Sequence, residues 1–327
     1  MPHVLVAGKI HPSGVALLRG APGVTFDLVE EVSEPSYAPL IDRADAVVLR
    51  TQPMTAATVA RAGRLQLVSR HGVGYDAVDV AALDARGIAL SVVGDVNTVA
   101  VAEHAMMMML AAVKKVLRAD RAVRDPSQWG WRNRLEAGEL AGKTLLVLGY
   151  GRIGRHLAGL ASAFGMKVVA HDPWLERQGW PEGAVRPVPG LAQALTMADV
   201  ISVHMPKADR PALGAAELAL VKPGAVIVNT ARGGIVDEAA LADALRDGRV
   251  AAAGLDVFDD EPPAADNPLL AFDQVLLSPH IGGLTTEGAE RLAVHSVQNV
   301  LDFFAGHLDP ALVVNAAALR GRKEPVR

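Results

Sequence analysis

Short apolar runs alternate with helical patterns along nearly the whole chain. Within residues 1–95, the runs HVLVAG, AVVLR, LQLVSR and IALSVV have the length of strands, and helix-like stretches separate them. An alternation of strands and helices is typical of an α/β unit with a parallel sheet. We therefore expect a small α/β domain at the start of the chain.

A long helical pattern from Thr98 to Val123 follows, and then a loop over residues 124–143. Helical patterns over residues 151–165 and 237–248 separate further apolar runs and complete βαβ units. Because these runs are continuous rather than alternating, they fit strands covered on both faces of a parallel sheet. The expected strands lie at residues 144–149, 167–172, 200–206, 225–231, 251–258 and 274–280.

The last helical segment, residues 289–315, has no strand of its own. If it packs back onto the first α/β unit, that domain is discontinuous in sequence. The hydrophobic pattern alone leaves this open. A length of 327 residues fits about two domains.

Composition narrows the function classes. Half of the residues are hydrophobic and 21% are charged, so the chain can bury a large core. The net charge of −4 and the lack of basic runs argue against a nucleic-acid-binding surface. Without cysteine, disulfides, thiolate catalysis and cysteine-bound zinc are excluded, and we expect no metal. The sequence shows no secretion signal and no apolar run of about 18 residues, so we expect a cytoplasmic protein without membrane contact.

Residues 149–154, GYGRIG, match the G-x-G-x-x-G pattern of dinucleotide-binding turns. An apolar run precedes them and a helical pattern follows, which is the context that the pattern requires. Such glycines let backbone N–H groups approach a pyrophosphate at a helix N-terminus. Asp172 ends the next apolar run, where a carboxylate accepts hydrogen bonds from ribose hydroxyls and repels a 2′-phosphate. This favours NAD over NADP; a glycine-rich turn without a ligand is the alternative.

Arg232, Glu261 and His280 each stand at or just after the end of an expected strand. Open α/β sheets bind ligands at the carboxyl ends of their strands. A guanidinium can hold a carboxylate through two hydrogen bonds, and a histidine can exchange a proton near neutral pH. A carboxylate beside that histidine orients it and favours the imidazolium. Taken singly, each residue also fits a plain loop side chain.

Seven segments, in their order along the chain, resemble the D-isomer-specific 2-hydroxyacid dehydrogenase family. They are RHGVGYDAVD, NTVAVAEHAMMMML, GKTLLVLGYGRIG, VISVHMP, VKPGAVIVNTARGGIVDEAALADAL, AAAGLDVFDDEPP and LLSPHIGGLTTEGAERL. The resemblance implies an α/β fold of two Rossmann-like domains. An NAD-binding domain, residues 98–288, would be inserted into a discontinuous flavodoxin-like substrate domain, residues 1–97 plus 289–327. The implied partner is a second copy in a homodimer, with residues 106–109 near the contact.

By the same resemblance, Arg232, Glu261 and His280 are the catalytic residues. His280 would give a proton to the carbonyl oxygen as NADH delivers hydride to C2 of a small anionic 2-keto acid, and would take it back in the reverse direction. Glu261 would keep His280 protonated and aligned. Arg232 would bind the substrate carboxylate and polarise the carbonyl.

The resemblance also implies binding residues outside this group. The substrate carboxylate would be held by backbone N–H groups of the loop His71, Gly72, Val73 and Gly74. Asp256 would lie near the nicotinamide carboxamide. The full set of implied cofactor contacts is Thr98, Gly149, Gly151, Arg152, Ile153, Gly154, Asp172, His204, Pro206, Thr230, Ala231, Asp256 and Gly282.

Substrate specificity is less clearly marked. Arg50 stands where phosphoglycerate dehydrogenases carry a phosphate-contacting arginine, which makes 3-phosphoglycerate, hydroxypyruvate or glyoxylate candidate substrates; a surface arginine at a strand end is the alternative. The side chain of His71 could also face the substrate. Glu261 argues against formate dehydrogenases, which carry Gln there. The sequence departs from many relatives at Ala77 and in the run after Pro206.

These motifs also fit a protein of another class. Transcriptional corepressors that share this fold sense NAD and keep similar motifs. The chain lacks the long basic or disordered extensions that recruit partners, which favours the enzyme. A sensor would bind NADH without appreciable turnover.

Overall fold

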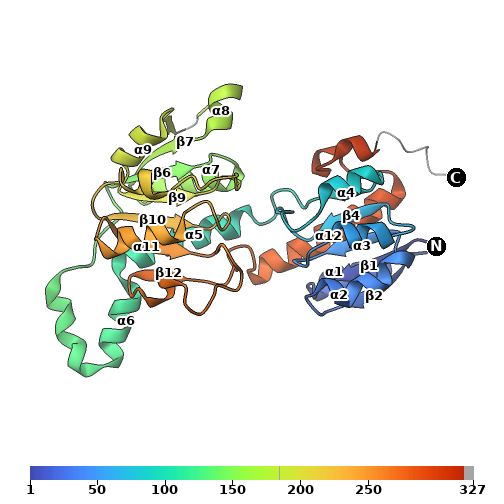
Figure 1. The fold of residues 1–327 in the computed structure, drawn as a ribbon, viewed down its shortest axis with the longest axis horizontal. Coiled ribbons are helices and arrows are strands. Elements are labelled where there is room, and N and C mark those ends of the chain that lie inside the picture. Colours follow the sequence, from blue (N-terminus) through green and yellow to red (C-terminus); the bar gives the residue numbers. More distant parts are fainter. Residues whose placement is uncertain (184, 320–327) are drawn as a thin grey trace. The chain divides into compact units, whose positions relative to one another are not determined.

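The structure is a computed structural model that describes residues 1–183 and 185–319. The described chain divides into two compact units (Figure 1). The first comprises Met1–Asn97 and the chain from Leu284 onward, and the second is Thr98–Gly283. The boundary falls at Leu284 rather than 289, because helix α12 (Thr286–Ala305) begins near it and packs on the first unit.

The first unit contains a five-stranded parallel sheet in the order β2-β1-β3-β4-β5, a flavodoxin-like order. Helices α1 and α12 cover one face, while η1, α3 and α4 cover the other. The strands are β1 (His3–Ala7), β2 (Thr25–Val29), β3 (Ala46–Leu49), β4 (Leu67–Arg70) and β5 (Ala89–Ser91). The remaining helical elements are α1 (Pro12–Gly20), α2 (Glu34–Tyr37), η1 (Ala38–Arg43), α3 (Ala56–Arg61), α4 (Val80–Ala85), η4 (Pro310–Leu312) and η5 (Ala316–Leu319).

The second unit contains a seven-stranded parallel sheet in the order β12-β11-β10-β9-β6-β7-β8. The strand order reverses between β6 and β9, which is the point where Rossmann-type sheets bind dinucleotides. Helices α5 and α7 cover one face, and α9, α10 and α11 cover the other. The strands are β6 (Thr144–Leu148), β7 (Lys167–His171), β8 (Arg186–Pro187), β9 (Val200–Val203), β10 (Ala225–Asn229), β11 (Val250–Leu255) and β12 (Val275–Leu277).

The helices of this second unit are mostly short. Their amino ends are often capped by an aspartate, as Asp172 does for α8 and Asp237 for α11. The helical elements are α5 (Thr98–Lys114), α6 (Val116–Arg124), η2 (Pro126–Arg134), α7 (Arg152–Ala163), α8 (Pro173–Gln178), α9 (Leu191–Met197), α10 (Ala215–Leu218), α11 (Glu238–Arg246) and η3 (Pro268–Ala271).

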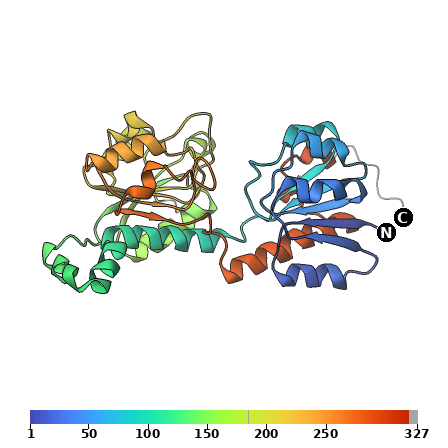
Figure 2. The same cartoon turned by 60° about the horizontal axis from the view of Figure 1, so that its bottom comes forward.

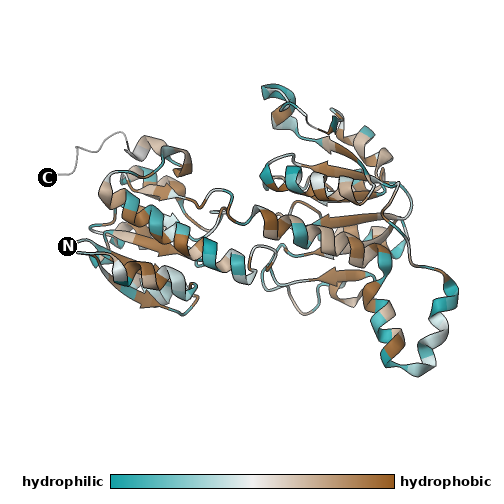
Figure 3. Ribbon diagram, turned by 180° about the vertical axis from the view of Figure 1, so that it is seen from behind, coloured by the Kyte–Doolittle hydropathy of each residue, from teal (hydrophilic) through white to brown (hydrophobic). Residues whose placement is uncertain are grey.

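The hydrophobic pattern predicts the inner strands but misses β2 and β8. Both lie at sheet edges, and neither contains a buried residue. Inner strands carry the continuous apolar runs because neighbours cover both faces, and Figure 3 shows hydrophobic residues concentrated along them. No helix within the described residues is long and apolar enough to cross a membrane.

The single helix expected over residues 98–123 is wrong. Lys115 adopts a left-handed conformation with φ of 55°, which interrupts the helical hydrogen bonding and separates α5 from α6. Part of the expected loop forms the 3₁₀ helix η2. We call α6 and η2, residues 116–134, the arm, because they extend away from the sheet of their own unit (Figure 2).

Candidate active site

The three residues with predicted catalytic roles follow adjacent strands of the second unit. Arg232 follows β10, Glu261 follows β11, and His280 follows β12. These strands are parallel neighbours, so their carboxyl ends share one edge of the sheet. The sheet topology therefore places all three residues at one edge of the sheet, the kind of edge where open α/β sheets bind ligands.

Glu261 and His280 form a hydrogen-bonded pair, with 2.7 Å between Glu261 Oε2 and His280 Nδ1. The backbone N–H of Phe258 donates to the other carboxylate oxygen at 3.2 Å. Burial raises the pKa of Glu261, but the hydrogen bond and charge of His280 and the Phe258 N–H outweigh it and hold the pKa below its ordinary value. An ionised carboxylate only accepts hydrogen bonds, so Nδ1 carries a hydrogen and Nε2 is left for proton exchange.

The pair borders a largely apolar cavity of about 390 Å³. The side chains of His280 and Glu261 remain 50% and 38% exposed, so a ligand can reach them. Apolar walls lower the local dielectric constant and strengthen the interaction within the pair. The apolar lining residues are Phe258, Pro262, Pro263, Leu270, Leu277 and Pro279.

Arg232 is half-buried and its loop is tightly packed. Its guanidinium donates to the carbonyl of Ala231 at 2.6 Å, and its own carbonyl accepts from the Asn229 side chain at 2.8 Å. A Cβ on Gly233 would lie 1.8 Å from the carbonyl oxygen of Phe258. The glycine after Arg232 therefore lets the β10 loop pack against the backbone that leads to Glu261.

The glycines of the β6–α7 turn occupy their positions for different physical reasons. A Cβ on Gly149, which has φ of +91°, would lie 2.7 Å from the backbone of His204, and one on Gly154 would lie 2.3 Å from the Gly149 carbonyl oxygen. Packing alone requires both glycines. Gly151 has φ of −75° and open space around its missing side chain, so neither packing nor backbone conformation requires glycine there. Close approach of a ligand to the turn would explain it.

Two buried polar atoms lack hydrogen-bond partners among the described residues at neighbouring strand ends. They are Thr230 Oγ1, after β10, and His204 Nδ1, after β9. Burial lowers the pKa of His204 to about 4, and its Nε2 lies 2.8 Å from Ser202 Oγ. Buried polar atoms normally find a partner. A polar ligand bound along this edge would give both atoms a hydrogen-bond partner, and the open space at Gly151 leaves room for it. The residues present therefore fit a dinucleotide.

The Asp172 carboxylate, which is predicted to contact the cofactor ribose, also accepts three backbone hydrogen bonds. One carboxylate oxygen accepts from the N–H of Tyr150 at 2.8 Å, and the other accepts from Trp174 and Leu175 at 2.9 and 3.1 Å. The side chain thus joins the glycine turn to the start of α8. These three hydrogen bonds leave about one lone-pair position of the carboxylate for a ribose hydroxyl. The contact with the ribose stays a prediction.

Asp256 is 2% exposed, and its carboxylate holds the loop that carries His280. Burial raises its pKa, but hydrogen bonds from His104, Ser278, Ile281 and Gly282 outweigh burial, and the pKa lies below its ordinary value. Sequence reasoning did not single out His104 or Ser278. The available clue was a histidine, next to Glu103, within a mostly apolar stretch of α5.

The predicted substrate residues Arg50, His71, Gly72, Val73 and Gly74 lie in the first unit, after β3 and β4. His71 is 6% exposed, and its Nε2 has no hydrogen-bond partner among the described residues. Burial, helped by the charges of Arg70 and Arg50, lowers the pKa of His71 to about 4.

Arg70, which sequence reasoning missed, donates to the carbonyls of Leu49 and His71 at 3.2 and 3.4 Å. Its own position at the end of β4 was the available clue.

Other predicted contacts lie on loops or helix starts of the second unit: Thr98, Arg152 and Ile153 on helices, and Pro206, Ala231 and Gly282 on loops. No group of three or more His, Cys, Asp or Glu in the described chain is placed to hold a metal.

Residues 106–282 match the family described as D-isomer specific 2-hydroxyacid dehydrogenase, NAD binding domain. The chain belongs to this family. The matched segment lies inside the second unit. The predicted family, the α/β fold with a Rossmann-type domain and NAD as cofactor are thereby confirmed.

Several proteins are similar to this chain over nearly its whole length. D-3-phosphoglycerate dehydrogenase of Mycobacterium tuberculosis is 39% identical over 317 residues, which cover 96% of this chain but 59% of that protein. Glyoxylate reductase of Aeropyrum pernix is 36% identical over 323 residues, covering 95% of this chain and 96% of the relative. The TT0316 protein of Thermus thermophilus has a solved structure with a TM-score of 0.86 and 32% identity, covering 95% and 99% of the two chains. The chain therefore spans only part of the length of its phosphoglycerate dehydrogenase relatives.

Proposed function

We propose that this protein catalyses hydride transfer between NAD(H) and C2 of a small anionic 2-hydroxy or 2-keto acid, with D-stereochemistry. The observation that carries the proposal is the Glu261–His280 pair on the ligand-binding edge of the NAD-binding sheet. It provides an oriented acid–base group at the strand ends where the cofactor is expected.

The side chains divide the remaining chemistry among them. Bound NADH supplies the hydride. In the reductive direction, His280 donates the proton on Nε2 to the carbonyl oxygen, and in the oxidative direction it accepts that proton from the hydroxyl. Glu261 fixes the ring through Nδ1 and balances the positive charge on the protonated ring. Arg232 binds the substrate carboxylate through its guanidinium and polarises the carbonyl.

The cofactor would lie along the edge of the β6, β9 and β10 strand ends. The backbone of the Gly149–Gly154 turn would approach the pyrophosphate, and Asp172 would accept from the ribose hydroxyls. The orphaned Thr230 Oγ1 and His204 Nδ1 supply further polar contacts. Thr98, Pro206, Ala231, Asp256 and Gly282 complete the expected set.

The substrate would be a 2-keto acid such as glyoxylate, hydroxypyruvate or 3-phosphohydroxypyruvate, or the corresponding hydroxy acid. Glyoxylate reductase and D-3-phosphoglycerate dehydrogenase among the similar proteins support this range. Arg50 and the loop His71–Gly74 are the proposed carboxylate and phosphate contacts. His71 is buried and lacks a partner for Nε2, which fits a hydrogen-bonding role.

We further propose a cytoplasmic homodimer. The arm exposes apolar side chains, including Val123, Trp129 and the neighbouring Leu135, which is 87% exposed. A second copy would cover them. Met106, Met108 and Met109 are buried in the core, so of the methionines on α5 only Met107 is available for such a contact. Light scattering during size-exclusion chromatography tests this state.

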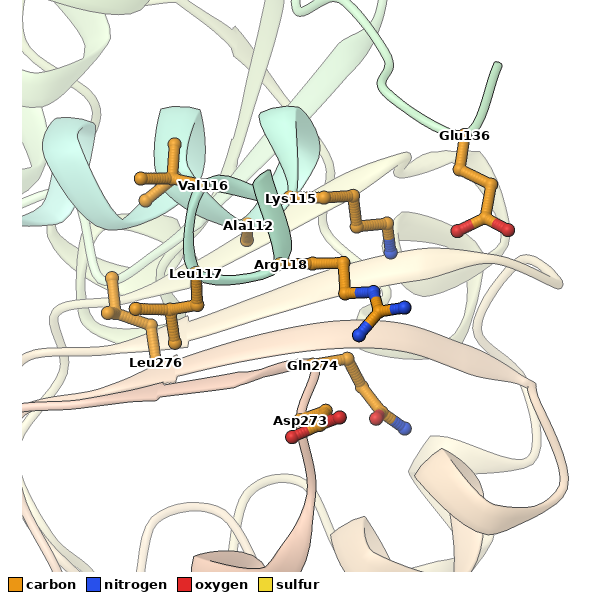
Figure 4. Close-up of a pocket in the computed structure, with 10 residues that line it drawn as sticks. Ala112, Lys115, Val116, Leu117, Arg118, Glu136, Asp273, Gln274 and Leu276 are labelled. Atoms are coloured by element: carbon orange, nitrogen blue, oxygen red, sulfur yellow. The ribbon is translucent and has the colours of Figure 1, made fainter. Parts of the chain in front are cut away.

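A small cavity of about 190 Å³ lies where the arm leaves α5 (Figure 4). Lys115 and Arg118 lie between Glu136 on one side and Asp273 and Gln274 on the other. Asp273 also pairs with Arg121, which ties α6 to the loop before β12. The cavity and the ion pair lie at the base of the arm, and neither involves His280 or Glu261.

The decisive experiment is NADH oxidation against a panel of 2-keto acids, with wild type beside His280→Ala. The panel contains glyoxylate, hydroxypyruvate, 3-phosphohydroxypyruvate, pyruvate, phenylpyruvate and 3-sulfopyruvate. We expect one acid to stand out and His280→Ala to lose turnover while NADH still binds. Binding of NADH without turnover of any acid would favour the NAD-sensing alternative.

A further inference from the structure

A network of polar side chains lies beneath the loop that carries His280. It joins His104 on α5, Asp256 after β11 and Ser278 after β12. His104 Nε2 is 2.9 Å from Ser278 Oγ and 3.5 Å from Asp256 Oδ1. Ser278 Oγ is 2.5 Å from Asp256 Oδ1. The side chains of His104 and Asp256 are only 14% and 2% exposed.

The network holds the backbone of the catalytic loop. Asp256 accepts from the N–H of Ile281 at 2.9 Å and from the N–H of Gly282 at 2.8 Å. Its main-chain carbonyl accepts from the N–H of His280 at 2.8 Å. His280 itself has φ of 53°, a left-handed conformation that a histidine seldom adopts. Three consecutive N–H groups thus end on Asp256 and maintain this conformation.

The direction of the hydrogen bonds assigns a role to His104. A carboxylate only accepts, so the Ser278 hydroxyl donates its single hydrogen to Asp256. Ser278 Oγ then accepts from His104, and His104 carries a hydrogen on Nε2. The ring also packs under the loop, because a Cβ on Gly282 would lie 3.5 Å from His104 Cδ2. Removing the ring would leave Ser278 without its donor and open space beneath Gly282.

We propose that His104 is a positioning residue for His280: through Ser278 and Asp256 it holds loop 278–282 in the conformation that directs the His280 ring toward Glu261. This inference rests on the proposed function, because positioning matters only if His280 exchanges a proton. His104 touches neither reacting atoms nor the pair itself. Misplacement of a catalytic group by about 1 Å can lower turnover by about a hundredfold.

The test compares His104→Ala, His104→Gln and Ser278→Ala with wild type. The matched control is His156→Ala, a half-buried histidine on α7 outside the network. Turnover is measured with the best keto acid of the panel, NADH binding by fluorescence, and amide exchange by mass spectrometry on peptides covering residues 278–284.

For His104→Ala we expect kcat to fall about 30-fold, with the Kd for NADH within about twofold of wild type. Amide exchange should quicken in residues 278–284 and not in strand β6. His104→Gln should recover most of the activity, because its side-chain amide can donate near the position of Nε2. Ser278→Ala should act in the same direction. A variant that combines His104→Ala with Ser278→Ala should be no worse than the more damaging single variant.

Two results would overturn the proposal. One is wild-type kcat and wild-type exchange in both His104→Ala and Ser278→Ala. The other is a loss that Gln does not rescue, accompanied by faster exchange throughout the second unit, which would mark His104 as a general packing residue. If the wild type turns over no acid, the proposed function fails. Amide exchange then tests separately whether His104 holds the loop. Unchanged exchange in His104→Ala refutes this, and faster exchange confined to residues 278–284 supports it.

Discussion

His71 and His280 stand in similar places in the two units, and their surroundings differ sharply. Each follows a strand of a parallel sheet and precedes a glycine-containing loop. His280 is half-exposed and hydrogen-bonded to a carboxylate. His71 is buried and has no carboxylate partner among the described residues. Burial, with the charges of Arg70 and Arg50, lowers its pKa to about 4.

The difference shows that a strand-end histidine is not in itself an acid–base residue. At neutral pH, His71 is uncharged and can only donate or accept hydrogen bonds. His280 has a carboxylate that can stabilise its protonated form through Nδ1 while Nε2 stays available. The partner, rather than the position along the strand, separates the proposed catalytic residue from the proposed binding residue.

The largest expected effect separates these two histidines directly. His280→Ala should lower kcat by about a thousandfold, because general acid–base catalysis is lost. His71→Ala should change kcat little and raise KM for at least one acid. Steady-state kinetics over the keto-acid panel measures both. An unchanged KM for every acid in His71→Ala would remove His71 from the substrate site.

The two kinds of glycine in the β6–α7 turn give the next contrast. Gly154→Ala should destabilise the fold by about 3 kcal/mol, because the new Cβ meets the Gly149 carbonyl oxygen. Gly151→Ala should leave the melting temperature unchanged and raise the Kd for NADH about tenfold, or ~1.4 kcal/mol. Thermal unfolding and fluorescence titration measure these effects. Equal NADH affinity in Gly151→Ala and wild type would argue against a pyrophosphate at this turn.

The buried state of His71 predicts a pH dependence of stability. Its folded pKa of about 4 lies below the ordinary value of 6.5, so the unfolded chain binds the proton first as pH falls. The stabilisation is fully present above pH 6.5 and is lost between there and about pH 4, with a decrease of about 2 kcal/mol by pH 5. His71→Gln should remove this pH-dependent part of the free energy of unfolding. Denaturant unfolding at pH 5, 6 and 7 measures it, and an identical slope in both proteins would contradict a buried neutral His71.

The smallest effect concerns Arg50 in the first unit. If it contacts a phosphate, Arg50→Ala should raise KM for 3-phosphohydroxypyruvate about tenfold and leave KM for glyoxylate unchanged, since only the former carries the extra anionic group. Arg64→Ala, which removes an exposed arginine paired with Asp45, is the matched control. Equal KM changes for both acids would place Arg50 on the surface.

Much of the fold follows from local patterns because inner parallel strands are apolar on both faces. Edge strands β2 and β8 escape this reasoning, since solvent covers them and they need no apolar run. The break at Lys115 also escapes, because residues on both sides favour helix and the left-handed conformation has no marker in the side chain itself.

For the candidate site, the sequence by itself determined which chemistry is present: the glycine turn, Asp172, and Arg232, Glu261 and His280 at successive strand ends. These depend on short motifs and on strand–helix alternation, which neighbouring residues encode. Only the tertiary structure decided how the residues act together. It paired Glu261 with His280, buried His71, and brought His104 of α5 beneath the catalytic loop. Such contacts join residues distant in sequence, and burial and hydrogen-bond partners exist only once strands and helices have packed.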